Sequence, residues 1–292
     1  WETKTDTGKQ MIPQNNEFYS YTFNAIKQNV KYWVNYDSPY YFSAWKNIQT
    51  TFDTIFVSDR PIIKKINFNI YPPQYTQEPM FEHPGNISTI SLPIGSRVNL
   101  TATSSKELEK SWLVLDKEIL KINSYNTLIN GTFNINKNQN LSIHIQDKNQ
   151  VNNLKPLNFN FSAIPDYSPD LIVQKPKAKF ELDESNIIFF DIQVTDDYGF
   201  SDSWIEYRIK APDYLKQDST IYKEQIKGLD LNTRSQQIYL EWDISNFSLA
   251  PEDELHLQIC IADNNSLVGA SITKSPVLIG RYPSIEDLFE RM

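Results

Sequence analysis

The chain has few of the residues that support disulfides or imidazole chemistry. Its 292 residues include a single cysteine, Cys260, and only three histidines. One cysteine permits no disulfide within the chain, which argues against a small disulfide-stapled scaffold and leaves both the cytoplasm and a bacterial periplasm open. The length suffices for two or three domains, each large enough to bury a core of its own.

Two further deficits narrow the class of partner. No stretch of the sequence reaches the roughly 18 consecutive apolar residues that a membrane-spanning helix needs. Basic residues are outnumbered, with 28 Lys and Arg against 36 Asp and Glu, which gives a net charge of −8. Surplus negative charge disfavours nucleic acid and anionic membrane surfaces. We therefore expect no nucleic-acid partner, and membrane contact only through segments outside this sequence.

Catalytic motifs are also missing from the sequence. It contains no Gly-x-Ser-x-Gly elbow, phosphate-binding loop or His-Glu-x-x-His motif. His144 and His256 fall on the polar faces of predicted strands, and His83 lies in a turn-rich stretch. Cys260 lies on the strand face opposite Leu255, a pattern that favours an inert thiol over a nucleophile. We predict a non-enzymatic protein that depends on no cofactor.

What the sequence does contain is strand-like alternation, together with 16 Tyr, 16 Phe and 6 Trp. Apolar and polar residues alternate most cleanly in Leu255-His256-Leu257-Gln258-Ile259-Cys260-Ile261, and similar runs cover 62–70 and 141–146. Such runs predict an all-β chain. The residues that we expect in the core of the last domain are Leu255, Leu257, Ile259, Ile205, Tyr207, Ile192, Val194 and Trp242.

Proline-containing stretches divide the chain at Pro61 and Pro165. The intervals 61–165 and 166–282 are close to the roughly 100 residues of an immunoglobulin-like β-sandwich, so we predict one such sandwich in each. The first interval, 1–60, is too short for a sandwich and is either half of one or a paired appendage. Residues 283–292 have helical spacing behind a candidate N-cap, Ser284, which predicts the start of a helix.

Several motifs resemble a known family when they are taken in order. They are Ile70-Tyr71-Pro72-Pro73-Gln74-Tyr75-Thr76, Val194-Thr195-Asp196-Asp197-Tyr198-Gly199-Phe200 followed by Ile205-Glu206-Tyr207-Arg208-Ile209, Trp242-Asp243-Ile244, Ala262-Asp263-Asn264 and Arg281-Tyr282-Pro283-Ser284-Ile285-Glu286-Asp287. This series resembles the bacterial membrane proteins catalogued as domain of unknown function 4175. The resemblance covers nearly the whole chain, but the family's Pro-Gly-Asp is here Pro251-Glu252-Asp253, and its Asp-Asn-Asp is Asp263-Asn264-Asn265.

The resemblance implies an N-terminal membrane anchor, tandem periplasmic immunoglobulin-like domains and a long helical region. It implies a periplasmic, extracytoplasmic location with attachment to the membrane through the parent protein, and it brings no assigned activity. By the same comparison, Trp1 resembles the strand-C tryptophan of a sandwich whose first two strands lie upstream. We therefore expect 1–60 to be a partial sandwich that lacks its N-terminal strands.

Acidic residues are predicted to meet at one end of the last sandwich. In an immunoglobulin-like sandwich the N-terminal entry, the B–C loop and the F–G loop share an end. Hard oxygen ligands at a domain junction suit Ca²⁺. The candidate metal residues are Asp166 and Asp170, Asp196 and Asp197, and Asp263, with Asn264 beside it. The alternatives are a solvated acidic surface and, for Asp196-Asp197, a turn before Gly199.

The aromatic residues of the first interval are the last candidate site. The side chains Tyr32, Trp33, Tyr36 and Trp45 could stack on a sugar or seat a protein, or they could be core that has lost its cover. The leading hypothesis is a structural and interaction module, a periplasmic spacer with protein partners. The alternative is a carbohydrate- or peptidoglycan-binding module, for which the ligand is a glycan.

Overall fold

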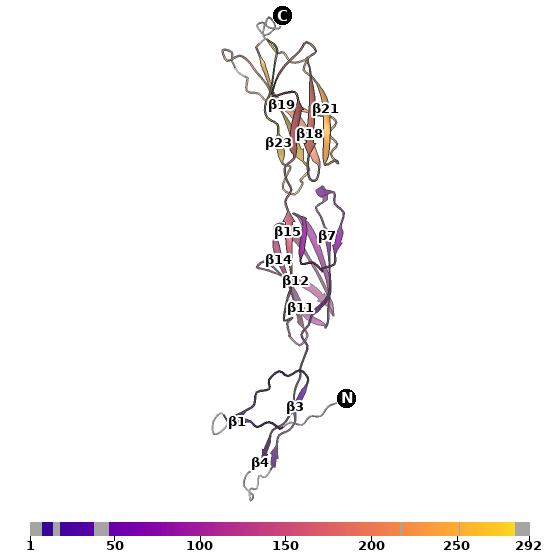
Figure 1. The fold of residues 1–292 in the computed structure, drawn as a ribbon, viewed down its shortest axis with the longest axis vertical. Coiled ribbons are helices and arrows are strands. Elements are labelled where there is room, and N and C mark those ends of the chain that lie inside the picture. The colour runs from indigo at the N-terminus through magenta and orange to yellow at the C-terminus, as the bar shows by residue number, and fades with distance from the viewer. Residues whose placement is uncertain (1–7, 14–17, 38–46, 217, 251, 284–292) are drawn as a thin grey trace. The chain divides into compact units, whose positions relative to one another are not determined.

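The computed structural model describes residues 8–13, 18–37, 47–216, 218–250 and 252–283. Within these ranges the regular structure is β-strand, apart from one 3-10 turn, η1 (Gln74–Thr76), which confirms the prediction of an all-β chain (Figure 1). No helix in the described part is long and apolar enough to cross a membrane. The helix predicted at 283–292 lies, apart from Pro283, outside the described residues. The chain divides into two units between Arg60 and Pro61.

The N-terminal unit consists of short paired strands. Strand β1 (Ile12–Pro13) pairs with β2 (Tyr19–Ser20), β3 (Val30–Tyr32) with β6 (Asp53–Ile55), and β4 (Asn35–Asp37) with β5 (Asn47–Gln49). A hydrogen bond from the Thr50 amide to the Val34 carbonyl, 3.0 Å long, joins the last two ladders into one irregular hairpin. No described residue of this unit is buried. Among the described residues these strand pairs therefore have no second layer over them, and the missing opening strands stay a prediction.

The first sandwich contains nine strands. They are β7 (Ile63–Tyr71), β8 (Phe81–His83), β9 (Thr89–Pro93), β10 (Ser96–Ser104), β11 (Leu108–Leu115), β12 (Glu118–Tyr125), β13 (Leu128–Ile135), β14 (Gln139–Asp147) and β15 (Leu157–Ile164). They are hydrogen-bonded in the order β8-β7-β10-β13-β12-β11-β14-β15-β9, with β12 pairing on both sides. Strand β9 runs parallel to β15, while all other neighbours are antiparallel. The first three strands, β7 to β9, thus supply the strands at both ends of this order, β8 at one and β9 at the other. Immunoglobulin-like folds divide their opening segment in a similar way.

Alternation along the strands builds the core of this sandwich. Val98, Leu100 and Ala102 of β10 point inward and are buried, while the residues between them are exposed or only partly buried. The phenyl ring of Phe161 contacts the rings of Phe68 and Phe133 edge to face, at centroid distances of 5.8 and 5.5 Å. Burial of large apolar side chains between two sheets supplies most of the stabilisation of such a domain.

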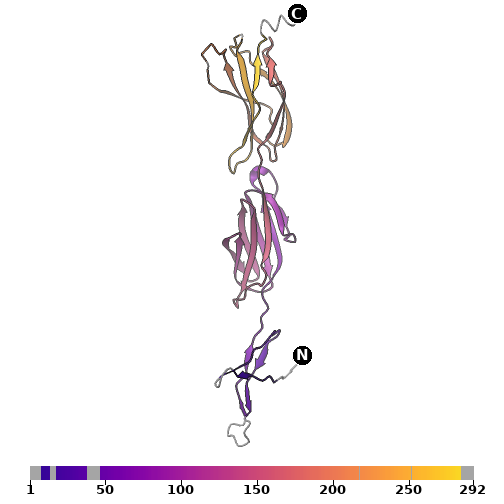
Figure 2. The ribbon, with the colours of Figure 1, turned by 60° about the vertical axis from the view of Figure 1, so that its left-hand side comes forward.

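The last sandwich has a similar arrangement, but its strands form two separate sheets. Its strands are β16 (Asp170–Lys175), β17 (Lys179–Glu181), β18 (Ile187–Thr195), β19 (Phe200–Lys210), β20 (Tyr222–Gln225), β21 (Ser235–Asp243), β22 (Glu254–Asp263), β23 (Ile272–Lys274) and β24 (Leu278–Arg281) (Figure 2). One sheet has the order β16-β18-β21, and the other has β17-β24-β22-β19-β20, with β23 paired to β22. Strand β17 is parallel to β24, as β9 is to β15.

The register predicted for the last core is confirmed. Leu255, Leu257 and Ile259 are at most 1% exposed, and the other predicted core residues are buried as well, with one exception. The exception is Tyr207, which is only partly buried. It lies near the C-terminal end of β19, where its ring packs on Trp242 at 5.2 Å within a group of aromatic rings at the margin of the core. The prediction that Tyr207 is buried is therefore wrong.

Candidate functional site

The turn between β18 and β19 uses a carboxylate to hold its backbone. Oδ2 of Asp196 accepts hydrogen bonds from the amides of Tyr198 and Gly199, at 2.9 and 2.8 Å. Gly199 has φ +114°, and a Cβ on it would lie 2.9 Å from the carbonyl oxygen of Leu231, so glycine is required here. The turn role considered for Asp196 is thus present. It occupies only one of the two carboxylate oxygens.

Three carboxylates converge beside this turn. One oxygen each from Asp166, Asp196 and Asp197 lies within 4.8 Å of the others. Asp166 belongs to the segment between β15 and β16, so the cluster joins the connection between the sandwiches to the β18–β19 turn. Asp197 Oδ2 accepts a long hydrogen bond, 3.4 Å, from the amide of Tyr167. Like charges at this separation repel strongly once they are removed from water.

The cluster has few internal partners for its charge. Both oxygens of Asp166 are buried without a hydrogen-bond partner, and so are Oδ1 of Asp196 and Oδ1 of Asp197. Burial raises the pKa of Asp166 to about 7, and the neighbouring carboxylate of Asp197 adds to the rise. Burial also raises the pKa of Asp196. The geometry therefore favours either a proton or a cation between these carboxylates.

The other two predicted ligands have different surroundings. Asp263 is buried, but its Oδ1 accepts hydrogen bonds from the amides of Asn265 and Ser271, at 3.1 and 2.9 Å, and so holds the β22–β23 loop. Asp170 is exposed at the start of β16. Neither belongs to the cluster. The five predicted residues thus separate into three that meet, one that supports a loop and one on the surface.

Asn264 connects the two sandwiches through its side-chain amide. Its Nδ2 donates hydrogen bonds to the carbonyl oxygens of Tyr75 and Tyr198, each 3.0 Å long. These two bonds fix the orientation of the amide group. Its Oδ1 is buried and has no hydrogen-bond partner. Such an unpaired buried acceptor is unfavourable unless something outside the protein contacts it.

Aromatic and cationic side chains complete this junction. The rings of Tyr75 and Tyr198 meet edge to face at 5.6 Å, and each residue is less than a tenth exposed. The guanidinium of Arg234 lies 5.7 Å from the Tyr198 ring centroid, donates to the Thr76 carbonyl at 3.4 Å and lies 3.7 Å from Glu78. Burial raises the pKa of both phenols, that of Tyr198 to about 12, so both stay neutral at physiological pH.

Sequence reasoning did not identify Tyr75 or Arg234 as junction residues. The contacts of Asn264 with Tyr75 and of Arg234 with Thr76 span 189 and 158 residues of sequence. No local pattern reveals contacts of that range. The one local signal was the position of Asn264 beside Asp263 in the loop that leaves β22.

The candidate aromatic residues of the N-terminal unit that the structure describes have different surroundings. Tyr32 donates a hydrogen bond from its hydroxyl to Asp53 Oδ2 at 2.9 Å, and the ring of Trp33 packs edge to face on that of Phe52 at 5.2 Å. Tyr36, in β4, is more than half exposed. Trp45 lies outside the described residues. Two of the three described rings are thus held by other side chains of the unit.

The histidines and the cysteine offer no catalytic arrangement among the described residues. His144 stacks on Trp112 at 5.3 Å, and His256 lies 2.6 Å from Glu254. His83 accepts a hydrogen bond from the Gly85 amide, 3.2 Å long. Cys260 is fully buried, and that burial raises the pKa of its thiol to about 11. Little thiolate exists at neutral pH, so this side chain is a poor nucleophile.

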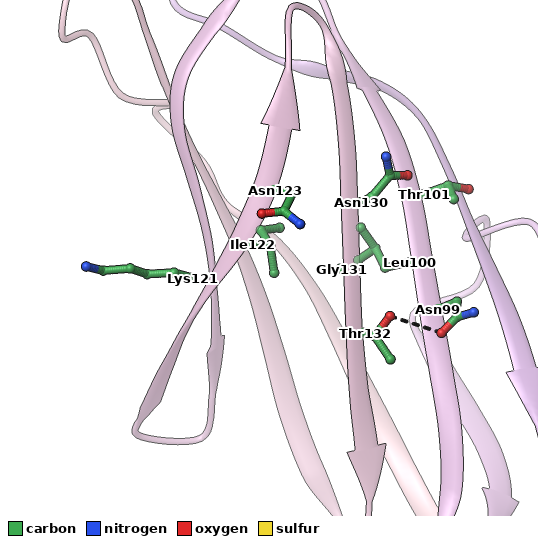
Figure 3. A pocket seen from close by; sticks show the side chains of 9 residues that line it. All are labelled: Asn99, Leu100, Thr101, Lys121, Ile122, Asn123, Asn130, Gly131 and Thr132. Atoms are coloured by element: carbon green, nitrogen blue, oxygen red, sulfur yellow. Dashed lines mark hydrogen bonds between the residues drawn. The ribbon is translucent and has the colours of Figure 1, made fainter.

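A shallow hollow lies on the first sandwich. It is lined by residues of β10, β12 and β13: Asn99, Leu100, Thr101, Lys121, Ile122, Asn123, Asn130, Gly131 and Thr132 (Figure 3). Thr132 donates a hydrogen bond to Asn99 at 3.1 Å, and Lys121 points away from the other side chains. The lining includes no carboxylate, imidazole or thiol. The lining therefore supplies no carboxylate or imidazole that could act as a base on its threonine hydroxyls.

Comparison with known proteins adds little to this description. No family model and no curated protein matches the chain. Among solved structures, the fibronectin(III)-like modules of Clostridium thermocellum CbhA are 12% identical, with 68% of this chain and 90% of that chain covered and a TM-score of 0.24. A chimeric titin Z1Z2–Z1Z2 tandem is 7% identical, with 67% and 95% covered and a TM-score of 0.23. At such scores the description of the fold rests on strand order alone. That order defines tandem immunoglobulin-like sandwiches.

Proposed function

We propose that this chain is a non-enzymatic structural and interaction module, in which tandem sandwiches hold the segments that they join at a fixed geometry. The observation that carries the proposal is the junction at Tyr75, Tyr198 and Asn264. Domains joined by a linker ordinarily move relative to one another unless their interface is well packed. Here a buried ring pair and the hydrogen bond from Asn264 to the Tyr75 carbonyl cross the interface. A built junction of this kind suits a spacer.

The setting that we propose is the periplasm, as part of a larger membrane-anchored protein. The support is the resemblance of the ordered sequence motifs to domain of unknown function 4175. Fractionation of cells that express the parent protein, with protease added to spheroplasts, tests this setting. Digestion from the outside is expected. Protection against external protease contradicts a periplasmic location.

The test of the spacer role is nuclear magnetic relaxation of backbone amides. We expect the two sandwiches to tumble together, because the junction resists bending, and so to share one rotational correlation time. Tyr198→Ala should give each sandwich a shorter time of its own, since it removes the buried ring pair. Tyr239→Ala is the matched control, because this tyrosine is 72% exposed on β21. Separate correlation times in the unaltered chain contradict the proposal.

The rival function is carbohydrate or peptidoglycan binding through the N-terminal aromatic residues. The observation in its favour is the exposed ring of Tyr36, which a sugar could cover. A pull-down on insoluble peptidoglycan, with Tyr36→Ala as the test variant and Tyr125→Ala as an exposed control, separates the two functions. Under the spacer proposal neither variant changes the bound fraction. Retention that Tyr36→Ala abolishes supports the binding module instead.

A further inference from the structure

We propose that β21, the outer strand of the last sandwich, pairs with β21 of a second copy of this chain. The two strands would run antiparallel about a two-fold axis at Tyr239. Strand β21 ends the sheet β16-β18-β21 and lies at one margin of the sandwich (Figure 1). No described residue pairs with its far side. The inference goes beyond the spacer role, because it names a partner for the module.

The first argument concerns the backbone groups on the free side of β21. The amide of Asp196 donates to the Arg234 carbonyl, and the amide of Ile244 donates to the Asn186 carbonyl, each at 2.8 Å. Arg234 and Ile244 flank β21 and face β18, so the even-numbered residues between them face β18 as well. The N–H and C=O groups of the odd-numbered residues therefore point to the free edge. These residues are Ser235, Gln237, Tyr239, Glu241 and Asp243.

The second argument is that the other edge strands of the two sandwiches carry features that limit pairing with another chain. Strands β8, β17, β20 and β23 have only three or four residues. Strand β9 has five and ends at Pro93, and β16 has a register shift between Val173 and Lys175. Strand β21 has nine residues, no proline or lysine, and a continuous register with β18. A long and regular edge of this kind is open to another strand.

The sequence of β21 is complementary to itself in the antiparallel direction. A pair centred on Tyr239 uses the whole strand and aligns odd-numbered with odd-numbered residues, so each opposed pair can exchange two backbone hydrogen bonds. Gln237 would lie opposite Glu241 of the second copy, and Ser235 opposite Asp243. Each carboxylate thus faces a neutral side chain that can hydrogen-bond to it. An axis at Glu241 would instead oppose that carboxylate to its own copy, which is unfavourable.

Pairing would also cover apolar side chains on both faces of the strand. Tyr239 is 72% exposed, and Phe189, on the same face of the neighbouring β18, is 56% exposed. On the core face, Leu240 is only partly buried, and Ile238 of the second copy would lie opposite it. Aromatic and aliphatic cross-strand pairs stabilise a sheet. The two-fold pairing occupies both free edges, so assembly stops at a dimer.

Sedimentation velocity of the whole chain over about 5–500 μM tests the pairing. One strand from each copy makes a small interface, so we expect a reversible dimer with Kd on the order of 10⁻⁴ M and a monomer below a few tens of micromolar. Tyr239→Pro removes an N–H that only the second copy uses. Proline is tolerated at such a position of an edge strand, so the fold should remain and the dimer should be lost.

A charge exchange tests the register. Ser235→Asp would oppose two carboxylates at both ends of the pair, so the chain should stay monomeric over the same range. Ser235→Asp combined with Asp243→Ser exchanges the two side chains and opposes carboxylate to hydroxyl again, so the dimer should return. Tyr125→Asp is the matched control, because it adds the same charge at a position of the first sandwich that is 76% exposed. It should leave the dimer unchanged.

Far-ultraviolet circular dichroism and the melting temperature show whether each variant is folded, and the Ser235 variants decide the matter if Tyr239→Pro does not fold. A chain that stays monomeric at the highest concentration overturns the proposal and leaves the edge to a strand of another protein. Equal weakening by Tyr125→Asp and Ser235→Asp, or a folded double variant that stays monomeric, also overturns it. Dimerisation lengthens the rotational correlation time of both sandwiches alike, whereas failure of the spacer role gives them separate times. The two failures are therefore distinguishable.

Discussion

The edge-to-face contact between Tyr75 and Tyr198 is expected to couple the stabilities of the two sandwiches. The perturbation is a double-mutant cycle with Tyr75→Leu and Tyr198→Leu, which keeps apolar bulk at both positions and removes the ring pair. The rings are 5.6 Å apart and less than a tenth exposed. Buried aromatic pairs of this geometry contribute about 0.5–1.5 kcal/mol beyond the area that they bury, so we expect a coupling free energy of about 1 kcal/mol.

The assay is equilibrium urea unfolding followed by tryptophan fluorescence and circular dichroism, with the transitions of the two sandwiches fitted separately. The ring pair stabilises whichever sandwich unfolds first, because that transition breaks the contact. Tyr207 supplies the control: its ring stacks on that of Phe247 within the last sandwich, so a cycle of Tyr75→Leu with Tyr207→Leu should be additive. A coupling free energy below about 0.3 kcal/mol between Tyr75 and Tyr198 refutes the reasoning. Mutations at sites that do not interact already deviate from additivity by about that much.

Three further predictions concern the last sandwich. Leu257→Ala should lower the free energy of unfolding by about 2–5 kcal/mol, because it leaves a cavity at a position that is 1% exposed. His256→Ala, on the other face of the strand, should lower it far less. Equal losses in urea unfolding contradict the register. Gly199→Ala should cost about 1–3 kcal/mol in the same assay, from strain at φ +114° and a close approach to a carbonyl, and a neutral result contradicts that turn geometry. Hydrogen bonds, chiefly the one from Lys274 at 2.5 Å, lower the pKa of Glu206 from its ordinary value of 4.5 to about 2. The Glu206 carboxylate therefore contributes stability above pH 4.5, and this contribution is lost as the pH falls toward 2. Acid titration of the melting temperature should show that loss, and Glu206→Gln should remove it; an unchanged acid limb in Glu206→Gln would falsify the assignment.

Strand register could be predicted because it depends on local alternation. The run from Leu255 to Ile261 shows which side chains face the opposite sheet, and the structure agrees. Tyr207 obeys the same alternation but lies at the margin of the core. The two-residue alternation shows which sheet face a side chain is on, but not how far the residue lies from the end of the sandwich. Position along the axis of a domain is a property of the whole fold.

The candidate site could be predicted only in outline. Topology alone brings Asp166 near the turn that contains Asp196 and Asp197, because the entry and the B–C loop share an end. It does not tell whether a carboxylate is used by its own loop, as Asp263 is, or faces solvent, as Asp170 does. Those outcomes depend on backbone hydrogen bonds formed after the loops fold. The binding of Ca²⁺ by these aspartates stays a prediction.

The aromatic residues of the N-terminal unit illustrate a different limit. Density of rings in sequence is compatible with a ligand platform, with core, and with rings that cover one another. Tyr32 and Trp33 are neighbours in the chain, yet one is bonded to Asp53 and the other packs on Phe52. Composition cannot separate these outcomes, because they differ in partners that lie some 20 residues away.

The measurement that tests the central claim most directly is the distribution of distances between spin labels on the two sandwiches. Tyr125→Cys and Tyr239→Cys place labels at positions that are 76% and 72% exposed, while Cys260 is fully buried and should remain unlabelled. With 5 mM CaCl₂, double electron–electron resonance should give one narrow distance distribution, because the junction fixes the two sandwiches relative to one another. A broad distribution, in calcium and in chelator alike, would contradict the claim that this junction is built to hold a fixed geometry.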